Sequence, residues 1–191
     1  MRLAIFGGMF DPPHLGHITL AGVTVEQLEV DTMLFIPTGD HPLKQLAGHS
    51  QARHRYEMTK LAVKDNPVFE VSGIEIIREG PSYTVDTLEE IQRLYSPEKL
   101  YLCIGADNAA IFDRWHDPNR ILELSTVVVW RRPGESIPDS PLIGRMQLLD
   151  TPLMNISSTE IRNLVREGKS IKDRVPPAVE DYILTHNLYR Y

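Results

Sequence analysis

The sequence contains a single cysteine, Cys103, among its 191 residues. One cysteine excludes an internal disulfide and any metal cluster held by several cysteines. Long apolar runs are also missing, since none approaches the ~20 residues that a membrane-spanning helix needs. The apolar run Leu3–Phe6 near the N-terminus is too short for the core of a signal peptide. We therefore expect a cytoplasmic protein that does not enter a membrane.

The sequence has fewer basic than acidic residues. The chain has 20 Lys and Arg against 26 Asp and Glu, which gives a formal net charge of -6. General binding of nucleic acid depends on a basic surface, so the composition disfavours that class of protein. A small anionic molecule can still bind where a few cations and histidines converge. The positions of these residues therefore matter more than their total.

The sequence also lacks internal repeats and low-complexity segments, and its remaining composition is that of an ordinary globular protein. Hydrophobic residues make up 42% of the chain and charged residues 24%. A length of 191 residues suits one domain with a substantial core. We expect a single domain over residues 1–191, with an α/β core over about 1–150 and a helical part over about 151–191.

Strand and helix patterns alternate along the chain. Short apolar runs predict strands over residues 3–6, 32–36, 69–77, 100–104 and 126–130. Helical spacing predicts helices over about 16–28, 51–64 and 84–95, with short helical pieces after residue 105 and a loop over 133–141. Such alternation is typical of a parallel sheet with helices on both faces. Ligands of these sheets bind beyond the carboxyl ends of the strands, so we expect residues 7–8, 38–44 and 105–107 along one edge.

The C-terminal part has helix signals alone. Ser157 and Glu160 form the pattern of a capping box, and Gly168 is a natural helix end. A last helix is predicted to start near Pro176–Pro177, because proline is allowed in the first turn. Its apolar stripe is predicted to dock on the body of the protein and consists of Val179, Tyr182 and Ile183.

The segment "IFGGMFDPPHLGHI", from Ile5 to Ile18, concentrates unusual residues between a strand and a helix. Gly7 and Gly8 allow a sharp turn and a close approach of a ligand to backbone N–H groups. The following helix would direct its positive end to the same place. His14 and His17 are three residues apart and share a helical face. Phosphate binding explains all of these features.

Two other interpretations of this segment remain open from spacing alone. Asp11, His14 and His17 could hold zinc or iron, although the glycine turn would then be unexplained. The segment could also be a tight turn with solvated histidines, in which Asp11 bonds its own backbone. The pattern matches neither the dinucleotide-binding glycine fingerprint nor the P-loop, which disfavours hydride transfer and P-loop ATPase activity.

Two signatures resemble those of a known superfamily. "GGMFDPPHLGH" resembles the first motif of the nucleotidyltransferases related to class I aminoacyl-tRNA synthetases, and "ISSTEIR" resembles their second motif. The segments "PSYTVDTL", "GADNAAIFDRW", "RRPG" and "DYILTHNLY" are similar to those of the nicotinate-nucleotide adenylyltransferases. The resemblance covers nearly the whole chain, and the second motif favours phosphate over metal at the first.

This resemblance implies a Rossmann-like, doubly wound, mainly parallel α/β sheet with a C-terminal helical appendage. It implies that ATP and nicotinate mononucleotide react to deamido-NAD and pyrophosphate in NAD biosynthesis, with Mg²⁺ carried by the ATP phosphates. Other phosphate acceptors, such as phosphopantetheine or nicotinamide mononucleotide, a non-catalytic nucleotide-binding module and a metal hydrolase are the alternative hypotheses. ATP and the mononucleotide are the expected partners, and self-association is left open.

The resemblance also assigns roles to residues. The implied catalytic residues are His17, His14 and Lys44. The implied ATP-binding residues are Gly7, Gly8, Met9, Phe10, His14, His17, Gly105, Asp107, Ile156, Ser157, Ser158 and Arg162. The implied mononucleotide-binding residues are Lys44, Tyr83, Thr84, Trp115 and Arg131. The loop "PTGDHPLKQ" departs from the Pro-Pro-His-Lys sequence common in the family, because His41 is displaced.

Several of these residues also have purely structural interpretations. Ser157 and Asp107 could be helix caps, Trp115 could pack in the core, and Arg162 could be a solvated charge. Met9 could fill space, and Cys103 is expected to be buried and inert.

Overall fold

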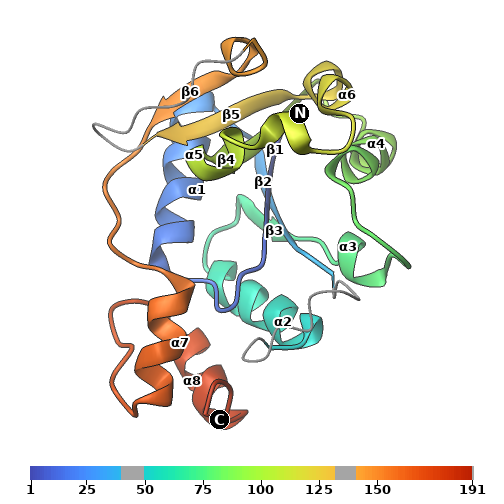
Figure 1. Ribbon diagram of the computed structural model, residues 1–191. Coiled ribbons are helices and arrows are strands. Elements are labelled where there is room, and N and C mark those ends of the chain that lie inside the picture. The colour runs from blue at the N-terminus through green and yellow to red at the C-terminus, as the bar shows by residue number, and fades with distance from the viewer. Residues whose placement is uncertain (40–49, 132–140, 191) are drawn as a thin grey trace. The chain divides into compact units, whose positions relative to one another are not determined.

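The computed structural model describes residues 1–39, 50–131 and 141–190 (Figure 1). Its six strands form one parallel sheet in the order β3-β2-β1-β4-β5-β6. The strands are β1 Arg2–Gly8, β2 Thr32–Pro37, β3 Phe69–Val71, β4 Lys99–Gly105, β5 Thr126–Arg131 and β6 Gln147–Asp150. The chain moves from β1 to one edge of the sheet and then returns to build the other side from β4. This reversal confirms the doubly wound α/β class, in which ligands bind beyond the strand ends where the order reverses.

The helices follow the strands much as the sequence predicts. They are α1 Leu15–Leu28, α2 Ala52–Val63, α3 Ile74–Ile77, α4 Thr84–Tyr95, α5 Ala106–Ala109, α6 Pro118–Leu124, α7 Ser158–Arg166 and α8 Pro177–Thr185. Two short 3₁₀ turns are η1 Phe112–Arg114 and η2 Ile143–Arg145. No helix within the described ranges is long and apolar enough to cross a membrane.

The chain divides into two compact units. The first unit comprises Met1–Gly7, Leu20–Leu34 and Ser82–Leu153, and the second comprises Gly8–Thr19, Phe35–Pro81 and Met154–Tyr191.

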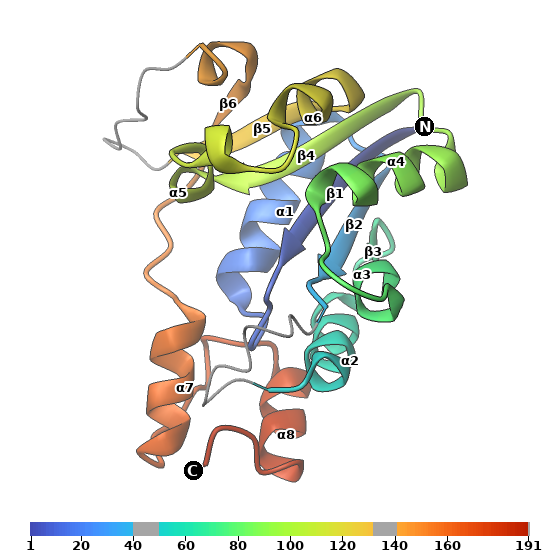
Figure 2. The same cartoon turned by 45° about the vertical axis from the view of Figure 1, so that its right-hand side comes forward.

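The core of the first unit is the sheet itself. β1 and β4 pair in parallel from Arg2 with Lys99 to Phe6 with Cys103, and β4 and β5 lie side by side (Figure 2). These strands are continuous apolar runs because both of their faces are covered. The Trp130 indole packs edge-on against Phe6 at 4.4 Å and donates a hydrogen bond to Thr24 at 2.8 Å.

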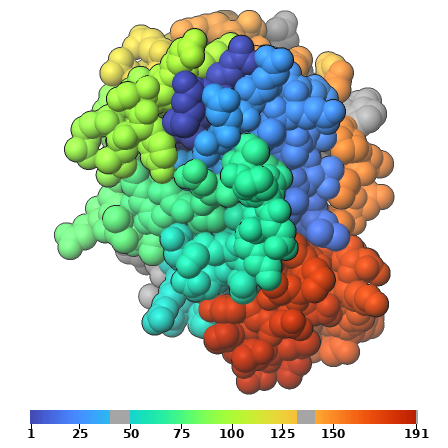
Figure 3. All heavy atoms as spheres, turned by 180° about the vertical axis from the view of Figure 1, so that it is seen from behind, coloured from blue at the N-terminus to red at the C-terminus, as the bar shows by residue number. Residues whose placement is uncertain are grey.

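The core of the second unit joins the C-terminal helices to α2. Its fully or almost fully buried members are Met58, Ile161, Val165, Ile171, Val175, Val179, Ile183 and Tyr189. Seen from behind, the C-terminal residues lie against the segment that carries α2 and β3 (Figure 3). The predicted docking of the last helix is confirmed, since Val179 and Ile183 are both 0% exposed and Tyr182 is half-buried.

The N-cap of α7 is Ser157, as the sequence predicts, and the helix ends before Gly168. The Ser157 hydroxyl accepts a hydrogen bond from the Glu160 backbone N–H at 3.2 Å. Gly168 lies just beyond the helix with a φ of 68°, a conformation that glycine adopts without strain. The Glu160 carboxylate pairs with Arg174 at 3.0 Å.

One predicted element is wrong. Residues 69–77 were expected to form one strand, but β3 stops at Val71 and α3 follows. The backbone N–H of Ser72 still bonds Phe35, while the Ser72 hydroxyl accepts from the Ile74 backbone N–H. Gly73 then starts a helical turn, because its carbonyl accepts from Ile76 and Ile77. Strand β6 was not predicted at all.

Candidate active site

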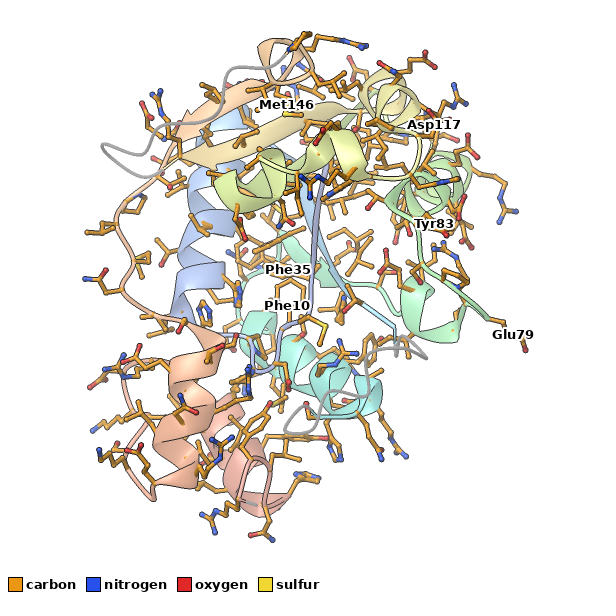
Figure 4. The ribbon with its side chains drawn as sticks, viewed as in Figure 1. Phe10, Phe35, Glu79, Tyr83, Asp117 and Met146 are labelled. Carbon is orange, nitrogen blue, oxygen red and sulfur yellow. The ribbon has the colours of Figure 1, made fainter. Side chains whose placement is uncertain are left out.

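The loop after β1 is shaped by a buried aromatic side chain. Phe10 has a φ of 47°, which lies in the left-handed region and is costly for a bulky residue. Its ring is 2% exposed and lies 5.7 Å from the Phe35 ring and 5.1 Å from the His17 ring (Figure 4). A hydrogen bond of 2.9 Å from the Thr38 backbone N–H to the Gly8 carbonyl closes the base of the loop. The strained turn is therefore held by packing on both sides.

His14 and His17 form a stacked pair at the start of α1. Their ring centroids are 3.6 Å apart and the planes differ by 19°. The backbone N–H of His14 donates to Nδ1 of His17 at 3.2 Å. Since Nδ1 accepts, the proton of the neutral His17 ring lies on Nε2, which is then a donor.

Both rings are neutral at physiological pH. Burial lowers the pKa of His14 to about 4. Burial, followed by the repulsion of a charged His14, keeps the pKa of His17 well below its ordinary value. The pair can therefore offer one N–H from each ring, and Arg162 adds a permanent positive charge to the same loop.

Gly16 leaves room for the ring of His14 in this stack. A Cβ at Gly16 would lie 3.0 Å from both Cε1 and Nδ1 of His14, closer than ordinary van der Waals contact. The glycine between the two histidines therefore has a steric reason. Within the described ranges, Nδ1 of His14 is a buried side-chain nitrogen with no hydrogen-bond partner.

The second motif is bonded directly to the first. The Ser158 hydroxyl donates to the Pro12 carbonyl at 2.9 Å, and the Arg162 guanidinium donates to the Asp11 carbonyl at 2.8 Å. Ser158 and Arg162 come from the first turns of α7, capped by Ser157. Two segments about 150 positions apart therefore converge, with two helix N-termini and one guanidinium. Arg162 is half-buried, so its interpretation as a solvated charge is wrong.

Arg55 is a positioning residue that the sequence did not reveal. Its guanidinium is 1% exposed and donates to the Met9 carbonyl at 3.0 Å, to the Thr38 hydroxyl at 3.4 Å and to the Gly39 carbonyl at 3.4 Å. The available signal was its spacing, because Arg55 shares an inward-facing stripe of α2 with Met58. Met9 is 37% exposed, so it does not simply fill space.

Asp11 has more distant partners than a turn-forming residue needs. Its carboxylate is 1% exposed and accepts hydrogen bonds from the Ser50 hydroxyl, from the Ser50 backbone N–H at 3.3 Å and from the Tyr189 hydroxyl at 2.6 Å. Sequence reasoning identified neither Ser50 nor Tyr189. No local pattern links residues so far apart.

Other sequence-predicted site residues lie in the first unit. Asp107 is exposed in the first turn of α5, so it is not the N-cap, which is Gly105. A Cβ at Gly105 would lie 2.5 Å from the Asp107 carboxylate, so the glycine makes room for that side chain. Trp115 is half-buried and its ring lies 5.1 Å from Phe112.

The remaining members of this set have defined neighbours. The exposed Tyr83 ring stacks on His116 at 4.3 Å, and Thr84 begins α4 (Figure 4). The Arg131 guanidinium pairs with Asp150 at 2.7 Å.

The remaining predictions concern five other residues. Gly7 ends the first unit's share of β1, and a Cβ there would meet nothing within 4 Å. Ile156 packs at the margin of the second unit's core. Cys103 is buried as predicted, and burial raises its pKa to about 12, so it stays an unreactive thiol. Lys44 and His41 lie outside the described residues.

The fold and the paired motifs define a nucleotidyltransferase, and residues 5–164 match the family model described as cytidylyltransferase-like. A Thermus thermophilus protein is 44% identical over 190 residues, with 100% of both chains covered, and a Thermomicrobium roseum protein is 40% identical over 196 residues, with 99% of this chain and 92% of the relative covered. Both are named probable nicotinate-nucleotide adenylyltransferase. The chain therefore belongs to the nicotinate-nucleotide adenylyltransferase family.

A solved structure has the same fold. The Plasmodium falciparum nicotinic acid mononucleotide adenylyltransferase, in complex with NaAD, aligns with a TM-score of 0.79 over 98% of this chain and 97% of its own. The sequence identity is 18%, so this likeness concerns the fold alone.

Proposed function

We propose that the protein transfers the adenylyl group of ATP to nicotinate mononucleotide, giving deamido-NAD and pyrophosphate. The observation that carries this proposal is the His14–His17 stack, bonded through its own loop to Ser158 and Arg162 of the second motif. The names of the relatives support the same reaction.

The reaction needs no protein nucleophile. The 5′-phosphate of the mononucleotide is already an anion, and one of its oxygens attacks the α-phosphorus of ATP in line. A new P–O bond forms while the bond from the α-phosphorus to the bridging oxygen breaks, and pyrophosphate leaves with that electron pair. The protein therefore has to position the two phosphates and stabilise charge on their oxygens.

We assign that work to the phosphate end of the site, in the second unit. Nε2–H of His17 donates to the α-phosphate, and His14 and Lys44 assist on the phosphates. Arg162 supplies positive charge for the β- and γ-phosphates. Backbone and side-chain contacts to ATP come from Gly8, Met9, Phe10, Ile156, Ser157 and Ser158 of this unit, and a further contact comes from Gly7 of the first unit.

We assign recognition of the nucleosides to residues of the first unit. Gly105 and Asp107 hold the ribose of ATP, where the carboxylate accepts hydrogen bonds from hydroxyls. Trp115 stacks on the pyridine ring or borders its pocket, together with Tyr83 and Thr84. Arg131 belongs to the same assignment. To bind the substrate, its guanidinium would have to give up its ion pair with Asp150.

Mg²⁺ fits this site as an ion carried by the ATP phosphates. The donors described at the phosphate end are imidazole, guanidinium, hydroxyl and amide groups, which suit phosphate oxygens rather than a cation. Mg²⁺ is commonly held by phosphates and water with few protein ligands. When bound, it would neutralise charge on the departing pyrophosphate.

One assay tests the proposal. The purified protein receives ATP, Mg²⁺ and, in turn, nicotinate mononucleotide, nicotinamide mononucleotide or phosphopantetheine, and pyrophosphate release is measured. We expect the highest kcat/KM with nicotinate mononucleotide. No release with that acceptor, or a clear preference for phosphopantetheine, would refute the proposal.

A further inference from the structure

Tyr189 joins the core of the second unit to the phosphate-binding loop. Its ring is 1% exposed and belongs to the buried cluster that contains Met58 and Val179. Its hydroxyl donates a hydrogen bond of 2.6 Å to Oδ1 of Asp11, a residue 178 positions earlier in the sequence. The ring and the hydroxyl therefore have separable tasks, packing and bonding.

Asp11, Ser50 and Tyr189 form a hydrogen-bonded group that we call the Asp11 cluster. The Ser50 hydroxyl donates to the same carboxylate oxygen and lies 3.4 Å from the Tyr189 hydroxyl, while the Ser50 backbone N–H contacts both carboxylate oxygens at 3.3 Å. Burial and the neighbouring carboxylate raise the pKa of Tyr189 far above its ordinary value, so its phenol remains a donor.

The backbone of the same aspartate is bonded to the second motif. Arg162 donates to the carbonyl of Asp11, and Ser158 donates to that of the next residue, Pro12. His14 follows two residues later. Any movement of Asp11 would therefore shift the acceptor that orients Arg162 and the segment that leads into the histidine pair.

The backbone of Tyr189 supports this interpretation. Its φ of 63° lies in the left-handed region, which is unfavourable for a bulky side chain. Such a conformation persists only where the surrounding contacts over-determine it.

We propose that Tyr189 is a positioning residue, whose hydroxyl, through Asp11, holds the loop that presents His14, His17 and Arg162 to the triphosphate. This inference rests on the proposed function. Tyr189 and Ser50 touch no reacting atom in this assignment, and their effect is exerted on the geometry of the loop.

The test compares two Tyr→Phe variants. Tyr189→Phe removes the hydroxyl but keeps the ring in the core. Tyr182→Phe is the matched control, because its hydroxyl bonds Nδ1 of His54 at 3.0 Å in the same unit, away from the Asp11 cluster. Ser50→Ala removes the second side-chain donor to Asp11, and it carries the test if Tyr189→Phe does not fold.

Three measurements are made at a temperature at which every variant is folded. For Tyr189→Phe and Ser50→Ala we expect kcat/KM for ATP to fall roughly 5- to 20-fold, the lower part of the range for a buried acceptor that loses a hydrogen bond. KM for the mononucleotide should change less than about 2-fold, and Tyr182→Phe should resemble the wild type in both respects. Hydrogen exchange of the segment 9–19 should be faster in the two cluster variants only.

Folded cluster variants with wild-type ATP kinetics and wild-type exchange over 9–19 would overturn the inference, as would an equal loss in Tyr182→Phe. Hydrogen exchange of the segment 9–19 in the two cluster variants and the control does not depend on the acceptor, and neither does the comparison among these variants. They therefore test the Asp11 cluster even if the wild type releases no pyrophosphate with nicotinate mononucleotide, a result that would refute the proposed function separately.

Discussion

Two regions of the molecule that carry site residues are held in different ways. The loop Gly8–His17 of the second unit is fixed by side chains from distant parts of the sequence, namely Arg55, Ser158, Arg162 and Tyr189. The segment Gly105–Trp115 of the first unit is held largely by bonds between near neighbours, such as Ala110 to Ala106 and Trp115 to Phe112.

This difference agrees with the two tasks that we propose for these regions. Stabilising charge in a transition state requires donors whose positions are already fixed, because reorganisation would cost part of the gain. Contacts to ribose and pyridine select the substrate and tolerate more local adjustment. Substitutions in the cross-linked loop should therefore affect turnover, and those in the locally held segment should affect binding of the acceptor.

The largest effect is expected at His17. His17→Ala removes the Nε2–H donor, and kcat should fall roughly 10²- to 10³-fold, as for other donors that stabilise developing charge. His186→Ala, which truncates an exposed histidine of the same unit, is the control and should be nearly silent. Steady-state pyrophosphate release measures both, and a near-normal kcat for His17→Ala would remove it from its assigned role.

The buried His14 should make the free energy of unfolding depend on pH. Between its ordinary value of 6.5 and about 4, His14 is protonated in the unfolded chain but not in the folded one. The unfolded state then binds more protons, so the free energy of unfolding should fall as the pH drops. His14 alone should account for roughly 2 kcal/mol between about pH 7 and about pH 4.5.

Urea unfolding at a series of pH values measures this dependence. His14→Asn should unfold with a shallower pH dependence than the wild type over the same interval, because it cannot bind the extra proton. Identical slopes for the two proteins would contradict the assignment of a neutral, buried His14.

Alanine substitutions at two glycines of α1 distinguish two effects. One is the steric contact with the histidine stack, and the other is the higher helix propensity of alanine. Gly16→Ala places a methyl group against the His14 ring, and we expect kcat to fall about 10-fold as the stack shifts. Gly22→Ala meets nothing within 4 Å in the same helix and should stabilise the protein by about 0.5–1 kcal/mol with unchanged kcat. Kinetics and thermal unfolding of both variants are compared, and a wild-type kcat for Gly16→Ala would contradict the steric demand of the stack.

The smallest effect is expected at Trp115, in the locally held segment. Trp115→Ala should raise KM for nicotinate mononucleotide roughly 3- to 10-fold through lost stacking, with kcat and KM for ATP little changed. Trp115→Phe keeps an aromatic face and should recover most of the affinity. A decrease in kcat alone would indicate that Trp115 acts together with the loop Gly8–His17. It would contradict the proposed difference between the two regions.

Local patterns account for most elements of the fold. The helix predicted over 84–95 is observed as Thr84–Tyr95, since an amphipathic stripe between turn residues is visible without any partner. The prediction of a strand over 69–77 is wrong beyond Val71, because the apolar residues of this segment suit a strand or a short helix equally. Hydrogen bonds of Ser72 and Gly73 made the choice there.

The sequence by itself determined the fold class, the two phosphate-type motifs and the chemistry that their residues can perform. These depend on spacing within short segments, which a chain carries before it folds. Only the tertiary structure decided that the histidines are stacked and neutral, that Arg55 is buried, and that Asp11 is bonded by Ser50 and Tyr189. Burial and contacts between distant segments arise from the folded chain as a whole, so no local pattern contains them.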